Sequence, residues 1–378
     1  MGPLSGLKII EIAGIGPGPF TGMLLADMGA EVISIHRRST GGNEKSAAIN
    51  ISERGKRPIA LNLKSAAGIA TALKLIESAD ALFEGFRPGV MERLGLGPEV
   101  CLAKNPKLVF GRMTGWGQDG PMAQAAGHDI NYISLSGALH AMGRKGQRPQ
   151  APLNLVGDFG GGAMFLAFGM MCAIIEAQRS GTGQVVDVSM VEGSANLMHM
   201  MYSMKAMGAW SEKRGSNLLD TGAHFYDTYE TKDAQFVSIG SIEPQFYALL
   251  IEKAELDKEK FAMQMNPKKW DSLRAELDDV FKQKTRDEWC EIMQGSDVCF
   301  APVLSMGEVQ EHPHNQARES FFEMNGVVQP APAPKFSQSK PALPAAPKPA
   351  GSETLAVLKE AGFSQGEIDS LDKEGVLT

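Results

Sequence analysis

The fold is decided by residues 7–36, LKIIEIAGIGPGPFTGMLLADMGAEVISIH. An apolar run at residues 7–12 predicts a buried strand, and the glycine- and proline-rich residues after it predict a loop. A helix that ends at Gly29 and a second strand at residues 31–36 follow from the apolar spacing. Residues 59–83 repeat this order of strand, helix and strand. Strands that alternate with helices of this length predict an α/β fold whose parallel sheet has right-handed crossovers.

The rest of the chain predicts a second, smaller domain. A large Rossmann-like α/β domain is expected over residues 1–200, and residues 191–207 are expected to form one helix. Residues 201–224 are expected to be a linker, and residues 225–320 a smaller α+β domain. Residues 321–378 comprise a stretch rich in proline and alanine, which favours an extended linker, and then a short pair of helices.

The composition narrows the class of protein. The chain has 378 residues and a formal net charge of -7, which argues against general nucleic-acid binding because such binding needs a basic surface. Its four cysteines have no metal-ligand spacing, so we expect no disulfide framework, no metal site and a reducing compartment. Cys172 is expected in the core, because its apolar run Phe159–Ile175 is more typical of a buried helix than of a membrane span. The start of the chain has no signal-peptide pattern, so the expected location is cytoplasmic.

The first loop fails the two requirements of a dinucleotide-binding turn. The third glycine of G-x-G-x-x-G is Pro19, and the second strand ends in His36-Arg37-Arg38 instead of an acid. An NAD enzyme is therefore disfavoured. Three basic side chains at the carboxyl end of a strand suit a phosphate, although they also fit a solvated charged turn. Further cations favour an anionic, phosphorylated ligand: Arg54, Lys56, Arg57, Lys64, Arg87 and Arg93.

Several motifs carry a family resemblance. Two are specific, GHDINY at residues 127–132 and NLVGDFGGG at residues 154–162. PLSGLKIIEIAGIGPGPF at residues 3–20 and GTGQVVDVSMVEG at residues 181–193 also match, and matching stretches continue in order to about residue 305. On these residues the chain resembles the class III CoA-transferase superfamily, and within it the branch of the α-methylacyl-CoA racemases.

The resemblance implies an interlocked homodimer. In this superfamily each subunit has a large α/β domain, built from the N- and C-terminal parts of the chain, and a smaller inserted domain. Residues 321–378 are therefore expected to return to the large domain. The active site is expected between the large domain of one subunit and the small domain of the other. The implied partners are an acyl-CoA thioester and a second copy of the chain, without a cofactor, nucleic acid or membrane.

The implied reaction moves the proton on the carbon next to the thioester carbonyl to the opposite face. It needs an acid/base group on each face and a group that stabilises the enolate oxygen. By resemblance, His128 is the base for the (S) substrate, Asp158 is the base for the (R) substrate, and Glu243 pairs with the histidine. A histidine titrates near neutral pH, and apolar surroundings should raise the pKa of Asp158. Taken alone, His128 and Asp158 also fit helix-start residues without a catalytic role.

Further positions are expected to support the site or to bind CoA. Asp129 is predicted to be the N-cap of a helix whose first N–H groups stabilise the enolate oxygen. By resemblance, Tyr132 lies near the active site. Also by resemblance, the residues near CoA are Arg37, Lys64, Arg87, Arg93 and Met113. Arg38 is expected to bind CoA as a member of the basic cluster after the second strand.

Two departures from the family pattern concern the ligand. His36-Arg37-Arg38 stands where the family has Asp-Arg-Pro. Thr221 and His224, in LLDTGAH at residues 218–224, stand where the family has glycine and proline. This loop is expected to shape the acyl end of the site. Branched fatty acyl, bile-acid precursor and aryl-propionyl thioesters all remain open as substrates.

Two other functions fit part of the pattern. A CoA-transferase would use Asp158 as a nucleophile on the thioester and form a mixed anhydride. A non-catalytic CoA-binding protein would keep the cations and lose the acid/base set. We favour a racemase because a transferase does not need His128 as a second base, and because His128, Asp158 and Glu243 occur together.

Overall fold

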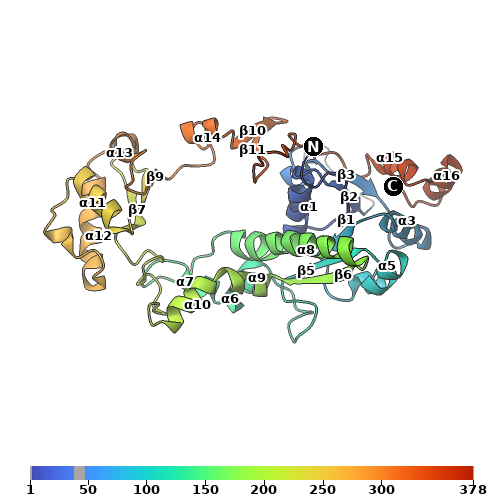
Figure 1. The fold of residues 1–378 in the computed structure, drawn as a ribbon, viewed down its shortest axis with the longest axis horizontal. Coiled ribbons are helices and arrows are strands. Elements are labelled where there is room, and N and C mark those ends of the chain that lie inside the picture. The colour runs from blue at the N-terminus through green and yellow to red at the C-terminus, as the bar shows by residue number, and fades with distance from the viewer. Residues whose placement is uncertain (1, 38–46, 378) are drawn as a thin grey trace. The chain divides into compact units, whose positions relative to one another are not determined.

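The computed structural model describes residues 2–37 and 47–377, which form two compact units (Figure 1). The first unit comprises the described parts of residues 1–136, 153–197 and 317–378, and the second comprises residues 137–152 and 198–316. Residues 137–152 thus belong to the second unit, whereas the sequence placed them in the large domain. Residues 201–224, expected as a linker, also belong to the second unit.

The first unit holds the large sheet and its helices. Its strands are β1 (Lys8–Ile12), β2 (Glu31–His36), β3 (Arg57–Ala60), β4 (Ala81–Glu84), β5 (Val109–Thr114), β6 (Gln184–Ser189), β10 (Phe321–Met324) and β11 (Val327–Pro330). Its helices are α1 (Pro17–Asp27), η1 (Ile51–Glu53), α3 (Ala66–Ile76), α4 (Val90–Arg93), α5 (Pro98–Lys104), α6 (Asp129–Leu135), η2 (Leu155–Ala163), α8 (Met164–Ser180), α9 (Met190–Leu197), α15 (Thr354–Glu360) and α16 (Gln365–Lys373).

The six-stranded sheet has the order β3-β2-β1-β4-β5-β6, and all its strand pairs are parallel. This order is that of a Rossmann-like sheet, which changes direction between β1 and β4. The predicted α/β fold with a parallel sheet is therefore confirmed. At this change of direction the loops after β1 and β4 diverge, which is where such sheets bind ligands.

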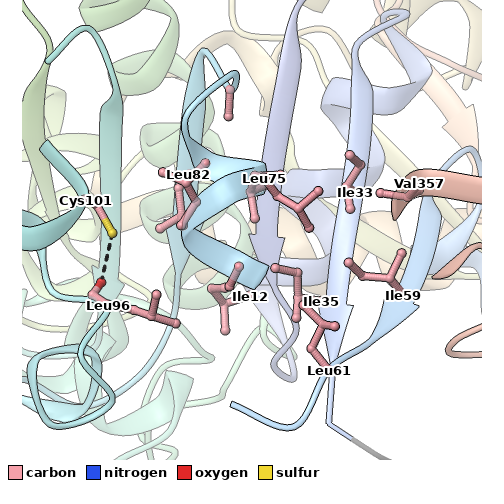
Figure 2. Packing of buried hydrophobic residues seen from close by; sticks show 14 of the residues in the cluster. Ile12, Ile33, Ile35, Ile59, Leu61, Leu75, Leu82, Leu96, Cys101 and Val357 are labelled. Atoms are coloured by element: carbon pink, nitrogen blue, oxygen red, sulfur yellow. Dashed lines mark hydrogen bonds between the residues drawn. The ribbon is translucent and has the colours of Figure 1, made fainter. Parts of the chain in front are cut away.

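Both faces of the sheet are covered, as parallel sheets require. On one face, Ile10, Ile33 and Ile59 pack with residues of α3, α5, α15 and α16. Figure 2 labels Leu75 of α3 and Cys101 of α5 among them. On the other face, Ile9 and Val109 pack with α1 and α8. Figure 2 shows Val357 of α15 beside Ile33, so the C-terminal helices complete the core of the first unit.

Helix α8 covers the sheet with only one of its sides. Leu166 and Met170 are buried against β5 and β6, whereas Met164 and Phe168 are 52% and 71% exposed. Cys172 is also exposed, so its expected place in the core is wrong. The apolar run continues around the helix, and only the side facing the sheet is covered. Together, η2 and α8 give the described residues one helix, of 26 residues, that is long and apolar enough to cross a membrane by length and composition.

The second unit contains a small antiparallel sheet with the order β7-β8-β9 and helices packed against it. Its elements are α7 (Ala138–Ala141), α10 (His199–Ala206), β7 (Tyr226–Glu230), β8 (Phe236–Gly240), α11 (Pro244–Lys253), η3 (Lys260–Ala262), α12 (Pro267–Phe281), α13 (Arg286–Met293), β9 (Phe300–Pro302) and α14 (Pro313–Ala317). The helix expected over residues 191–207 is wrong, because Met198 leaves helical geometry and separates α9 from α10. This break coincides with the boundary between the two units.

Three of the cations that favoured a phosphate ligand are instead used inside the fold. Arg54 and Asp27 form a buried ion pair at 2.6 Å, and Lys56 lies 2.7 Å from the buried Glu11. Arg57, at the start of β3, pairs with carboxylates of three glutamates: Glu31, Glu353 and Glu360. The expectation that these cations bind the ligand is therefore wrong. Buried charges are stable only when paired, so these partners account for the cations.

His224 is a buried titratable residue in the core of the second unit. Its ring is fully buried, and Nε2 is hydrogen-bonded to the Tyr247 hydroxyl at 2.6 Å. Nδ1 is buried and has no hydrogen-bond partner within the described part of the chain. Burial, and to a smaller degree the charge of Arg274, lowers the pKa of His224 to about 3. The folded protein therefore holds a neutral histidine at this position at neutral pH.

We predict that His224 makes the protein less stable in weak acid. The unfolded chain binds a proton near the ordinary histidine pKa of about 6.5, whereas the folded chain does not until about pH 3. Stability is therefore lost as the pH falls through this window, by about 2 kcal/mol between roughly pH 8 and pH 5. The free energy of unfolding of His224→Gln, measured with urea at several pH values, should lack this part of the dependence on pH. The surface variant His314→Gln is the control, and an unchanged slope in His224→Gln would contradict the assignment.

Candidate active site

A pocket of about 410 Å³ lies at the carboxyl ends of β4 and β5. Its walls are the loop after β4, the loop after β5, residues 123–128 and the first turns of α6. Four predicted site residues line it together: His128, Tyr132, Arg87 and Met113. Parallel sheets bind ligands at this edge, because the connections that leave the strands are free to vary there.

His128 stands at the start of α6, with its side chain exposed at the pocket. It is the N-cap residue, so the prediction that Asp129 is the N-cap is wrong. The physical reason is that Asp129 directs Oδ1 to the Asp158 backbone N–H, at 2.7 Å, and not to its own helix. His128 is exposed and lines the pocket in which a substrate would bind.

Asp158 lies in η2, a π-helical segment that leads into α8. Burial raises the pKa of its half-buried carboxyl group, and the negative charge of Asp129 raises it further. The hydrogen bond from Asn154 Nδ2, 3.2 Å from Oδ2, lowers the pKa, as does the charge of His128. The net effect is a raised pKa, which makes this carboxyl group a better base near neutral pH.

The loop after β1 approaches the same carboxyl group. Gly16 has φ +74°, and a side-chain carbon built there would lie 3.8 Å from Asp158 Oδ2. Phe20 of α1 packs against Phe159, with ring centroids 4.9 Å apart. The loop that failed as a dinucleotide motif therefore lies beside Asp158.

Tyr132 packs inside the pocket wall. Its ring meets Trp116 edge to face at 4.9 Å, and its hydroxyl donates to the Gly127 carbonyl. Burial and the charge of Asp158 raise the pKa of Tyr132, so the phenol stays protonated at neutral pH. Because its proton is donated to Gly127, we assign Tyr132 a packing role in the wall.

The remaining predicted residues lie away from this pocket or outside the description. Arg37, Lys64 and Arg93 are exposed and do not line it. Arg38 lies outside the described residues. Glu243 is exposed at the start of α11 in the second unit, and its pairing with His128 stays a prediction.

An ion-pair network around the buried Glu84 and Arg112 holds the loop after β4, and it was not predicted from the sequence. Glu84 accepts the Phe86 N–H at 2.6 Å and the Arg112 Nε–H at 2.9 Å. Arg112 also donates to Glu92 of α4, with the closer bond at 2.7 Å. This network fixes both ends of the loop that carries Arg87 into the pocket. The acids and the arginine are far apart in the sequence, so no local pattern indicates it.

Asn131 and Asn154 were also missed. Asn131 Oδ1 accepts the His128 backbone N–H at 3.0 Å, and Asn154 hydrogen-bonds to Asp158. Both lie within the two motifs that carry the resemblance, GHDINY and NLVGDFGGG. Their place in these motifs was the only available signal.

The fold and this pocket agree with the comparisons with known proteins. Residues 4–354 match the family model described as CoA-transferase family III, and the chain therefore belongs to this family. It is 45% identical to the alpha-methylacyl-CoA racemase of Mus musculus, over 99% of this chain and 97% of that protein. It is 42% identical to the alpha-methylacyl-CoA racemase of Homo sapiens, with the same coverage. The resemblance found in the sequence is thus confirmed.

A solved structure supports the fold. A CAIB/BAIF family protein from Brucella suis superposes with a TM-score of 0.81 at 24% identity. The match covers 95% of this chain and 99% of that one. It therefore extends over both compact units.

Gly115 makes the room that Tyr132 occupies, and this generates a prediction. A side-chain carbon at Gly115 would lie 2.0 Å from the Tyr132 ring, so Gly115→Ala must displace the ring or the loop after β5. We expect a loss of roughly 1–3 kcal/mol in the free energy of unfolding, measured with urea. Gly85→Ala, in the same pocket wall, is the matched control. Its added carbon would meet only the Met113 carbonyl oxygen, at 3.7 Å, so equal stabilities of the two variants would contradict this account.

Proposed function

We propose that this chain is a racemase that interconverts (R)- and (S)-2-methylacyl-CoA thioesters through an enolate. The observation that carries the proposal is the pair of acid/base groups at one edge of the sheet. An exposed His128 lines the pocket, and a half-buried Asp158 lies near enough for the two charges to influence each other. Proteins that are 42–45% identical over 99% of this chain are alpha-methylacyl-CoA racemases.

The proton balance follows from two different bases. With the (S) substrate, neutral His128 takes the α-proton, the enolate forms, and protonated Asp158 delivers its proton to the opposite face. With the (R) substrate the roles reverse, and Asp158 must begin ionised. A raised carboxyl pKa makes it easier for Asp158 to carry the proton that it must deliver. No cofactor is required, because CoA is part of the substrate.

Recognition of the CoA part is proposed to use cations at the same edge of the sheet. Arg87 lines the pocket, and the exposed side chains of Arg37, Lys64 and Arg93 are available to phosphates. Met113 adds an apolar wall. For the enolate oxygen we retain the N–H groups at the start of α6, next to His128.

A class III CoA-transferase is the alternative function. There the Asp158 carboxylate attacks the thioester carbonyl, CoA leaves as the thiolate, and an acyl–aspartyl anhydride forms. The relatives of this chain include proteins named as racemases and proteins named as CoA-transferases. Membership of the family therefore does not distinguish between the two reactions. An exposed histidine that lines the pocket and is close enough to influence the charge of Asp158 favours proton transfer.

The proposed active enzyme is an interlocked homodimer in the cytoplasm. The exposed apolar side of α8, which includes Met164, Phe168 and Ile175, is too apolar to be favoured in water. A second copy of the chain would cover it. In this arrangement Glu243 of the partner subunit pairs with His128, as the family resemblance implies.

We predict that His128→Ala and Asp158→Ala each lower the racemisation rate at least about 100-fold, the usual contribution of a general acid or base. The KM for the acyl-CoA should change little, because neither residue is proposed to bind CoA. Epimer interconversion is followed by chiral chromatography. His314→Ala and Asp372→Ala, both exposed elsewhere, are the matched controls. Racemisation at the parent rate by either active-site variant would refute the two-base assignment.

We predict that Phe168→Asp weakens the homodimer. A charge placed on the exposed apolar side of α8 must be desolvated in the dimer, which should raise the dissociation constant at least about tenfold, equal to 1.4 kcal/mol. Light scattering over a dilution series measures the mass. Gln178→Asp, on an exposed polar position of the same helix, should leave the mass unchanged. A monomeric parent protein, or a dimer unaffected by Phe168→Asp, counts against the proposed interface.

A further inference from the structure

The first turn of α6 supplies hydrogen-bond acceptors to the backbone of both proposed acid/base residues. Asn131 Oδ1 accepts the His128 N–H at 3.0 Å, and Asp129 Oδ1 accepts the Asp158 N–H at 2.7 Å. The second bond joins residues that are 29 positions apart in the chain. One short turn of helix therefore connects the two residues that must act on opposite faces of one carbon.

The Asp158 N–H needs a partner because of how its own helix begins. The first N–H groups of any helix have no carbonyl acceptor within that helix. In an α-helix the Asn154 carbonyl would accept from Asp158, four residues on. In the π-helical η2 this carbonyl instead accepts from the Phe159 N–H, at 3.4 Å. The Asp158 N–H is thus left to Asp129, which caps a helix other than its own.

Asp129 is held in this place at a local cost in stability. The residue is only 5% exposed, and its Oδ2 is buried with no hydrogen-bond partner among the residues that the structure describes. A buried carboxylate with an unpaired oxygen destabilises a fold. The Asp129 carboxylate also leaves room only for glycine at position 157, since a side-chain carbon at Gly157 would lie 2.5 Å from Asp129 Oδ1. Because Asp129 lowers the stability of the fold, its presence is better explained by its hydrogen bond to Asp158 than by a contribution to folding.

We propose that Asp129 is the positioning residue that holds Asp158 in place relative to His128, by fixing the Asp158 backbone. The inference rests on the function proposed above and names a further residue that this function requires. The side chain of Asp129 does not touch the substrate in this account. It acts through the hydrogen bond to Asp158, and Asn131 holds His128 in the corresponding way.

The charge of Asp129 gives a readout that a purely structural residue would lack. The groups that act on Asp158 are Asp129, whose negative charge raises its pKa, His128 and the Asn154 amide, which lower it, and Tyr132, which lies close enough to respond to its charge. Replacing Asp129 by asparagine keeps the shape and the Oδ1 acceptor but removes the charge. The pKa of Asp158 should therefore fall, and its ionised form should persist to lower pH.

The test compares Asp129→Asn with Asp129→Ala in racemisation of (R)-2-methylacyl-CoA, the direction in which Asp158 removes the proton. Asp129→Ala should lower kcat at least about 100-fold and change KM by less than about threefold, because position and not binding is lost. Asp129→Asn should keep kcat within about tenfold of the parent and move the acidic limb of the pH profile to lower pH. Asp372→Ala, at an exposed aspartate of α16, is the matched control and should match the parent.

Two results would overturn the positioning role. One is a parent-like kcat in Asp129→Ala. The other is an Asp129→Asn enzyme, folded by its urea transition, that is as slow as Asp129→Ala and has an unmoved acidic limb. Failure of the proposed function is distinguishable, because it appears in the parent enzyme as CoA transfer to an added acid without racemisation. In that case the same variants are compared by transfer rate, since Asp158 would still need to be held.

Discussion

A parallel sheet must be covered on both faces, and the rest of this structure depends on how the chain meets that requirement. Helices α1 and α8 cover one face, while α3, α5 and the C-terminal α15 and α16 cover the other. Residues 317–378 therefore return to the first unit after residues 198–316 have formed the second. The inserted position of the second unit is a consequence of completing the core with the end of the chain.

Because both faces of the sheet are covered, the position of a charged side chain determines whether it can bind a ligand. Cations near the sheet that are buried, such as Arg54 and Lys56, are paired with acids inside the fold and are not available to a ligand. The loops at the carboxyl ends of β4 and β5 stay open to solvent, and the buried Glu84–Arg112 pair holds one of them in place. Chemistry is thus confined to the edge where the backbone leaves the sheet. At that edge α6 and η2 bring a histidine and a carboxyl group near each other.

The alternation of apolar strands and helices was sufficient to predict the parallel sheet, because every strand except the edge strand β6 is largely buried on both faces and the helices cover it with one side. The motifs GHDINY and NLVGDFGGG indicated His128 and Asp158. The sequence does not show which acid pairs with which cation. Arg54, Lys56 and Arg57 were therefore wrongly assigned to the ligand, although acids inside the fold pair with them. The contact between Asp129 and Asp158 spans 29 residues and depends on π-helical geometry, for which a glycine-rich sequence gives no distinctive periodicity. Cys172 was misplaced for a related reason, since an apolar run does not reveal which side of a helix is covered.

The central claim is that the site moves a proton on the α-carbon and does not transfer CoA. Incubation of the purified protein with (S)-2-methylacyl-CoA in deuterated water, without any free carboxylic acid, tests it most directly. The account predicts deuterium at the α-carbon together with formation of the (R) epimer, as both proton donors exchange with solvent. An (S) substrate that neither exchanges nor epimerises, followed by CoA transfer once a carboxylic acid is added, would contradict it and make Asp158 a nucleophile.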